Sequence, residues 1–184
     1  MANTFTMSFK STILILPGLG NSGPQHWQSV WERKYGFLRV EQQDWETPVR
    51  TDWTAKLNET ISQVETENII LVAHSLACTT VAYWAQQYPT KIKGALLVAP
   101  SDTEADTYPP GTSGFTPVPL AKLPFPSIVV ASTNDYYVTL DRAKLFAGSW
   151  GSDFVNIADA GHINVAAGFG KWDQGLELLK ALDQ

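Results

Sequence analysis

Short apolar runs recur along the chain and alternate with longer stretches in which apolar and polar residues are mixed. The runs are rich in aliphatic and β-branched residues and show no polar alternation, which is typical of strands buried on both faces. They span residues 12–16, 37–41, 68–73, 94–99, 127–132 and 154–157. The pattern therefore predicts six strands.

The mixed stretches predict five helices, which span residues 24–35, 52–65, 75–88, 140–147 and 172–182. In the second of them, Trp53, Leu57 and Ile61 recur at helical spacing on one face. Pro24 suits the first turn of the first helix. Strands that alternate with helices form a parallel sheet covered on both faces. We therefore predict a three-layer α/β/α sandwich around a mostly parallel sheet of about six strands.

Residues 100–126 interrupt this alternation. They hold seven of the eleven prolines and show no clear period. A connection of this length inside a compact domain is often a binding loop or a lid. We expect the segment to cover the active site, with Tyr108 and Phe115 lining a pocket. A Pro-rich surface loop without ligand contact is the alternative.

Composition narrows the class of protein. Hydrophobic residues make up 44% of the 184 residues and charged residues 17%, as in one globular domain. We expect residues 1–184 to form that domain, with residues 1–10 as a tail. The net charge of −5 disfavours nucleic acid and membrane surfaces as partners. No protein partner is indicated.

The single cysteine, Cys78, excludes an intramolecular disulfide, and we expect it to be a small core residue. No group of His, Cys and carboxylate residues has the spacing of metal ligands, so we expect neither a metal nor another cofactor. The first apolar run is too short for a signal peptide, which favours a cytoplasmic location.

Ser75 lies where the third predicted strand meets the third predicted helix, with Ala73 and Ala77 two residues to either side. A nucleophile elbow needs small residues at these positions, because the turn is tight and holds the serine in a strained conformation. The usual pattern has glycine at both positions, so this is a weaker form of the motif. A serine that caps a helix is the alternative.

Two further candidates follow later strands. Asp135 comes after the fifth run and His162 after the sixth. Loops after the carboxyl ends of parallel strands share one edge of the sheet, and serine, acid, histidine is the order found in α/β-hydrolases. We predict Ser75 as nucleophile, His162 as base and Asp135 as the acid that orients it. Asp102 and Asp159 are alternative acids.

Charge on a substrate carbonyl would need hydrogen-bond donors. The backbone N–H groups of Leu76 and Leu19 are the expected oxyanion hole. Gly18, Gly20 and His26 are further candidates for the pocket. His74 is expected to point away from Ser75.

The same glycines form a competing motif. Residues 18–23 match G-x-G-x-x-G between a strand and a helix, with Glu41 or Asp44 about twenty residues further on, which is the context of a dinucleotide-binding fingerprint. Pro17 and Pro24 frame a longer loop than the tight turn that places a pyrophosphate on a helix N-terminus. An oxyanion loop is therefore favoured over a dinucleotide site.

Motifs spread over nearly the whole chain resemble the small single-domain serine hydrolases of the α/β-hydrolase superfamily that are similar to retinoblastoma-binding protein 9. The motifs are LPGLGNS, HW at 26–27, DW at 44–45, VAHSLAC, LLVAP, LPFPS, STND and AGHIN. The resemblance implies Ser75 as nucleophile, Asp135 as acid and His162 as base, in a minimal fold without a separate lid domain. Ala77 stands where such proteins usually have glycine.

The sequence as a whole predicts a carboxylesterase-like serine hydrolase that cleaves a small ester, thioester or amide through an acyl-enzyme. A binding or scaffold protein on a hydrolase fold is the alternative, since fold does not imply function. Dinucleotide binding at residues 18–23 is the third hypothesis.

Overall fold

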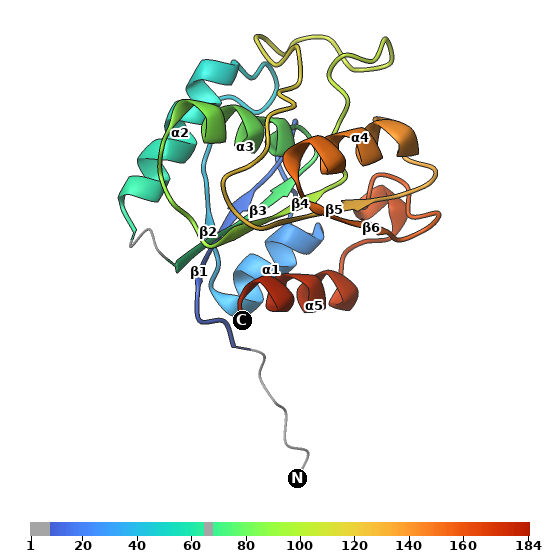
Figure 1. Ribbon diagram of the computed structural model, residues 1–184. Helices are drawn as coiled ribbons and strands as arrows, with labels where there is room; N and C mark the ends of the chain where they lie inside the picture. The colour runs from blue at the N-terminus through green and yellow to red at the C-terminus, as the bar shows by residue number, and fades with distance from the viewer. Residues whose placement is uncertain (1–7, 65–67) are drawn as a thin grey trace.

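The computed structural model describes residues 8–64 and 68–184, which form a six-stranded sheet between two layers of helices (Figure 1). All neighbouring strands are parallel. Their order across the sheet is β2-β1-β3-β4-β5-β6. The strands are β1 (Thr12–Leu16), β2 (Leu38–Arg39), β3 (Ile69–His74), β4 (Gly94–Val98), β5 (Ser127–Ala131) and β6 (Asp153–Asn156). The predicted fold class is confirmed.

Helices cover both faces of the sheet. On one face lie α1 (Trp27–Tyr35) and α5 (Asp173–Leu182); on the other lie α2 (Arg50–Ser62), α3 (Leu76–Gln87) and α4 (Leu140–Trp150) (Figure 1). A short 3-10 helix, η2 (Val165–Ala167), precedes α5. None of the helices in the described ranges has the length and apolar character that a membrane span needs.

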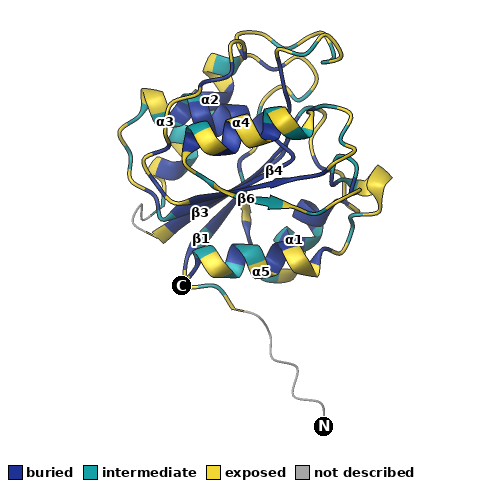
Figure 2. Cartoon of the chain, turned by 45° about the vertical axis from the view of Figure 1, so that its right-hand side comes forward, coloured by how far each residue is buried: buried dark blue, intermediate teal, exposed yellow. Residues whose placement is uncertain are grey.

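The core consists of two apolar layers, one on each face of the sheet, and β3 contributes side chains to both. Successive side chains of a strand point to opposite faces. Ile69 and Leu71 accordingly pack with α2, α3 and α4, whereas Ile70 and Val72 pack with α1 and α5. Every residue of β3, β4 and β5 is buried (Figure 2). This burial explains why the central strands read as continuous apolar runs.

The two edge strands differ from the prediction that all six strands are buried on both faces. β2 has only two residues, and Leu38 in it is 47% exposed. β6 is partly exposed along its length (Figure 2). Each edge strand has one neighbour in the sheet, so the helical layers do not enclose it.

Helix ends also differ from the prediction. α1 begins at Trp27, and Pro24 lies in the preceding turn, because His26 is the N-cap and accepts a hydrogen bond from the Gln28 N–H group at 3.2 Å. α2 begins two residues early, and residue 65, its predicted end, lies outside the described residues. α4 continues to Trp150, where Gly151 in the left-handed conformation ends it.

The sheet has one switch point, between β1 and β3. These strands are neighbours, yet the chain leaves β1 for α1 on one face and leaves β3 for α3 on the other. Loops that diverge in this way open a crevice at the carboxyl ends of the strands, which is where open α/β sheets bind ligands.

Candidate active site

Ser75 occupies the sharp turn between β3 and α3. Its φ of 60° and ψ of −125° lie in a region that residues with a side chain rarely adopt. The Ser75 N–H group donates to the carbonyl oxygen of Val98 at 3.0 Å, which ties the turn to β4. The side chain makes no capping hydrogen bond to α3, so the helix-cap interpretation of Ser75 is wrong.

Gly18, in the loop after β1, packs directly on this turn. A Cβ atom at residue 18 would lie 2.8 Å from the Cβ atom of Ser75. Below Ser75, Ala73 and Ala77 are 0% and 2% exposed, so the alanines fill the positions that need small residues. The glycine loop and the serine turn therefore form one compact unit at the switch point.

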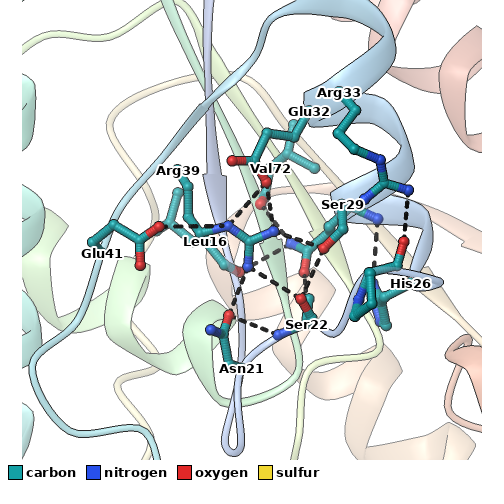
Figure 3. A network of polar contacts seen from close by, with 12 residues as sticks. Leu16, Asn21, Ser22, His26, Ser29, Glu32, Arg33, Arg39, Glu41 and Val72 are labelled. Atoms are coloured by element: carbon teal, nitrogen blue, oxygen red, sulfur yellow. Dashed lines mark hydrogen bonds and ion pairs between the residues drawn. The ribbon is translucent and has the colours of Figure 1, made fainter.

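A polar network fixes the glycine loop to α1 and to the sheet (Figure 3). The Arg39 guanidinium donates to Asn21 Oδ1 at 2.6 Å and to Ser29 Oγ at 2.7 Å. The Gln28 amide nitrogen donates to the carbonyl oxygens of Leu16 and Val72, at 3.0 and 3.1 Å. Those carbonyls lie near the ends of β1 and β3, so Gln28 connects the two strands whose loops meet at the switch point.

His162 and Asp135 reach Ser75 from the loops after β6 and β5. His162 Nε2 lies 2.8 Å from Ser75 Oγ, and His162 Nδ1 lies 2.9 Å from each carboxylate oxygen of Asp135. The Asp135 side chain is fully buried and also accepts from the Tyr137 N–H group at 2.9 Å. A carboxylate only accepts hydrogen bonds, so Nδ1 carries the imidazole proton and Nε2 accepts from the Ser75 hydroxyl.

The two loops that carry His162 and Asp135 are bonded to each other. Asn134 Oδ1 accepts from the Gly161 N–H group at 2.7 Å, and Ser132 Oγ accepts from the Ala160 N–H group at 2.9 Å. These bonds join two residues that shortly precede Asp135 to the two residues just before His162. They fix the position of the Asp135 carboxylate relative to the His162 imidazole.

The alternative acids have other partners. Asp102 binds Arg142 through two hydrogen bonds of 2.9 Å. Asp159 accepts from the Thr133 hydroxyl. Within the described chain, Asp135 is therefore the one of the three candidate acids that is bonded to His162.

All three histidines lie together. The ring centroids of His26 and His74, and those of His74 and His162, are 4.9 Å apart. His74 Nε2 donates to the carbonyl oxygen of His162 at 2.8 Å. Burial is the main cause that lowers the pKa of His26 to about 4 and that of His74 well below its usual value. The neighbouring His162 is the second cause for both residues. His26 and His74 are thus uncharged at neutral pH.

A cavity of about 310 Å³ opens onto Ser75. Its lining includes the predicted residues Gly18, Leu19, His26 and Tyr108. It also includes residues that the sequence did not single out for the pocket, which are Asn21, Gly23, His74, Ser101, Pro109, Tyr137, Asn164, Val165 and Ala166. His74 was expected to point away from Ser75; it lines this cavity, and its Nε2 is bonded to the carbonyl oxygen of His162 and not to Ser75 Oγ.

Two predicted pocket residues lie elsewhere. The Gly20 N–H group donates to the carbonyl oxygen of Trp45 at 2.8 Å. Phe115 is 1% exposed and packs against Trp53 and Leu76 beneath the loop. A phenylalanine in a loop is as well suited to anchoring the loop as to contacting a ligand, and sequence alone does not separate the two roles.

The expected oxyanion donors, the N–H groups of Leu76 and Leu19, lie in different elements. Leu76 is the first residue of α3, so its N–H group has no partner within the helix. Leu19 lies in the turn after β1 and lines the cavity. Leu76 thus directly follows Ser75, and Leu19 belongs to the loop on the other side of the switch point.

The dinucleotide interpretation finds little support in this geometry. Gly18 packs on Ser75, and α1 begins only at Trp27. The Asp44 carboxylate accepts from the N–H groups of Glu46 and Thr47, at 2.9 and 2.8 Å. The glycine loop therefore adjoins the serine turn instead of leading directly into a helix N-terminus.

Cys78 is buried in α3, and its thiol contacts the carbonyl oxygens of Ala73 and Val98. Burial raises the pKa of the thiol, which keeps it protonated. In the described ranges, no group of three or more His, Cys, Asp or Glu residues is arranged to hold a metal ion.

Comparisons with known proteins agree with the fold and with a serine hydrolase family. The family model described as serine hydrolase matches residues 13–181. A YdeN-like hydrolase from Pectobacterium atrosepticum shares 32% sequence identity at a TM-score of 0.82, over 94% of this chain and 92% of that one. A search of the curated proteins gives no match.

Two more distant structures show the fold alone. The YdeN gene product of Bacillus subtilis has 20% identity and a TM-score of 0.78, over 94% of this chain and 98% of that one. The carboxylesterase CesB of Bacillus subtilis has 12% identity and a TM-score of 0.66, over 94% and 84%. The family match spans almost the entire described chain, and the chain therefore belongs to the serine hydrolase family and is a hydrolase with the α/β-hydrolase fold.

Proposed function

We propose that the chain cleaves a small ester, thioester or amide through an acyl-enzyme formed on Ser75. The observation that carries this proposal is the continuous hydrogen-bonded chain from Ser75 Oγ through His162 to Asp135, with distances of 2.8 and 2.9 Å. A serine hydroxyl is a weak nucleophile at neutral pH, and an adjacent base activates it. The similarity to CesB, which is a carboxylesterase, favours an ester.

In the acylation step, His162 Nε2 takes the proton of the Ser75 hydroxyl while Oγ bonds to the substrate carbonyl carbon. The carbonyl oxygen becomes an oxyanion, which the N–H groups of Leu76 and Leu19 stabilise. One such donor is typically worth about 3 kcal/mol of barrier. The bond to the leaving group then breaks, and the leaving group receives the proton from Nε2.

In the deacylation step, a water molecule gives its proton to His162 Nε2 and attacks the acyl carbon. Collapse of the second tetrahedral intermediate returns the proton to Ser75 Oγ and releases the acid. Asp135 stays ionised throughout and stabilises the imidazolium. The neutral rings of His26 and His74 support this cycle, because a second positive charge nearby would oppose protonation of His162.

The test is labelling with a fluorophosphonate, which reacts with activated serines, followed by intact mass measurement and peptide mapping. We expect one adduct, on Ser75, that is absent in Ser75→Ala and strongly slowed in His162→Ala. Ser127→Ala is the matched control, because Ser127 is also a buried serine with a hydroxyl partner, Ser152. It is the first residue of β5 and therefore lies at the edge of the sheet opposite to the site. A folded protein that is not labelled at Ser75 would contradict the proposal and favour a binding or scaffold role.

A further inference from the structure

The cavity beside Ser75 lacks fixed charge. Among the described residues that line it, none is Asp, Glu, Lys or Arg. Asp102 and Asp135, which lie in loops at the same edge of the sheet, are bonded to Arg142 and His162. Asp106 is exposed and does not line the cavity. A charged substrate group held in this cavity would lose water and gain no partner of opposite charge, which is costly.

Two residues that line the cavity carry a hydrogen-bond donor that has no partner within the described structure. The Tyr108 hydroxyl oxygen is buried and has no hydrogen-bond partner within the described structure. Burial raises the pKa of Tyr108, so the hydroxyl keeps its proton. His26 Nδ1 accepts from the Gln28 N–H group, so the neutral His26 ring carries its proton on Nε2, for which the described structure gives no acceptor.

Tyr108 is held firmly at the cavity wall. Its N–H group donates to the carbonyl oxygen of Ala105 at 2.9 Å, and its ring packs against the cluster of Trp53, Leu76 and Phe115. Leu76 follows the nucleophile, so this packing links Tyr108 to the serine turn. A buried hydroxyl without a partner is unfavourable, and a ligand oxygen that accepts from it removes the penalty.

We propose that the acyl group bound beside Ser75 is short and uncharged and carries an oxygen that accepts a hydrogen bond from Tyr108. The volume of about 310 Å³ matches a small acyl group with its leaving group. The inference rests on the proposed function, because it describes the substrate of that same site. It excludes short acyl groups that carry an ammonium or a carboxylate.

Four p-nitrophenyl esters test this inference. The butyrate is the uncharged reference; the methoxyacetate replaces one methylene by an ether oxygen; the 3-aminopropanoate replaces the terminal methyl by an ammonium; and the monoglutarate carries a carboxylate. Each kcat/KM is divided by the rate constant for spontaneous hydrolysis of the same ester. We expect the methoxyacetate to be preferred over the butyrate by about five- to tenfold, and both charged esters to fall at least about tenfold below the butyrate.

Tyr108→Phe removes only the hydroxyl and should lower the ratio of kcat/KM for the methoxyacetate to kcat/KM for the butyrate to about one. Tyr83→Phe is the control, because the Tyr83 hydroxyl donates to Pro117 outside the cavity. Charged esters that react as fast as the butyrate, or a preference unchanged in Tyr108→Phe, would overturn the inference. So would labelling of Ser75 without hydrolysis of the butyrate or the methoxyacetate. No labelling and no hydrolysis would instead reject the proposed function itself.

A second inference rests on an independent contact. Ser101, in the loop after β4, is 1% exposed, and its Oγ lies 2.7 Å from Ser75 Oγ. The Ser75 hydroxyl donates its one proton to His162 Nε2, which has none of its own. The proton between the two serines must therefore come from Ser101, so Ser101 donates to Ser75 Oγ.

We infer that Ser101 is an additional catalytic residue, which stabilises the negative charge that develops on Ser75 Oγ as His162 takes its proton. Hydrogen bonds strengthen when the acceptor becomes charged. The contribution of Ser101 thus appears in the transition state more than in substrate binding. This role also rests on Ser75 being the nucleophile.

Ser101→Ala should lower kcat for the butyrate ester by about tenfold or more with little change in KM, and should slow fluorophosphonate labelling equally. Ser101→Thr, which keeps the hydroxyl, should recover most of the rate. Ser152→Ala is a matched control, since Ser127 and Ser152 form a second pair of hydroxyls 2.7 Å apart outside the site. An unchanged kcat in a folded Ser101→Ala protein would refute the role. A loss that appears only in KM, or that Ser101→Thr does not reverse, would do the same. If the fluorophosphonate labelled Ser75 neither in the Ser101→Ala variant nor in the unaltered protein, the proposed function itself would be rejected.

Discussion

Gly18 and Ser75 touch across the ends of two neighbouring strands. A Cβ atom on residue 18 would lie 2.8 Å from the Cβ atom of Ser75 and 2.9 Å from the carbonyl oxygen of His74. Both neighbours belong to the strained turn or its strand, so neither has room to move aside. The absence of a side chain at residue 18 is therefore a condition for the position of Ser75.

Gly18→Ala should displace either the loop after β1 or the serine turn. We expect fluorophosphonate labelling of Ser75 to slow by about a hundredfold, because small displacements of reacting groups have effects of this size. Circular dichroism should show that the variant remains folded. Labelling at the original rate would show that the contact has no influence on the reactivity of Ser75.

Gly148→Ala provides the contrast. Gly148 lies exposed inside α4, and a Cβ atom there would have no neighbour within 4 Å. Alanine loses less conformational freedom than glycine in a helix, so we expect the free energy of unfolding to rise by about 0.5–1 kcal/mol. Urea denaturation measures the change, and the labelling rate of Ser75 should stay the same.

Asp135→Asn should remove the charge that stabilises the protonated imidazole and permit the wrong tautomer of His162. In a serine protease, the corresponding change lowers kcat by about 10⁴-fold, and we expect a loss of similar size here. Asp159→Asn is the comparison, since Asp159 is exposed and bonded to Thr133. Equal losses in the two variants would mean that Asp135 has no special role.

Arg142→Met should destabilise the protein. Arg142 makes two hydrogen bonds of 2.9 Å to Asp102 and one of 2.7 Å to Glu104, and Asp102 is only 7% exposed. Methionine keeps an apolar side chain but removes the guanidinium that lies over the Phe146 ring and binds Asp102. We expect the free energy of unfolding to fall by about 1–3 kcal/mol in urea denaturation.

The control for Arg142→Met is Lys144→Met, and the quantity compared is the change in the free energy of unfolding. The Lys144 ammonium is 3.9 Å from Asp141, and both side chains are exposed. Surface pairs of this kind contribute about 0–1 kcal/mol. If the two variants had the same stability, the bonds between Arg142 and Asp102 would add nothing beyond a surface ion pair.

Stability should decrease as the pH falls from about 6.5 toward 4. His26 and His74 have a lowered pKa in the folded chain, so the unfolded chain binds protons that the folded chain excludes. The free energy of unfolding then rises with pH through this window, by up to about 1.4 kcal/mol per pH unit for each histidine. Urea denaturation at several pH values measures the slope.

His26→Asn tests the assignment of that slope. Asparagine keeps an acceptor at the N-cap of α1 but does not titrate. The variant should show a shallower dependence of the free energy of unfolding on pH between 6.5 and 4. An identical slope in the variant would assign the effect to other groups.

The sequence predicts those parts of the fold that follow from burial and connectivity. β3, β4 and β5 appear as apolar runs because both faces are covered. Ser75, Asp135 and His162 are recognisable as candidates because each lies in the turn or loop that follows a strand. Exposure at the sheet edge depends on the arrangement of whole helices, so the brevity of β2 and the partial exposure of β6 were not predictable from local patterns.

The parts of the site that the sequence did not reveal depend on contacts between distant loops. Ser101 has no motif, and its role follows only from the position of its hydroxyl 2.7 Å from that of Ser75. The partner of Asp102 is Arg142, forty residues further along the chain. Phe115 and Tyr108 lie in the same loop, yet one is buried under it and the other faces the cavity.

The position of His162 after the edge strand β6 has a consequence for how the enzyme loses activity. β6 is bonded only to β5 and is partly exposed, whereas β3, which positions Ser75, is buried between two strands. Local opening at an edge requires less free energy than global unfolding. The imidazole can therefore detach from the serine in a subglobal opening while most of the sheet persists, so inactivation by denaturant should precede the loss of secondary structure.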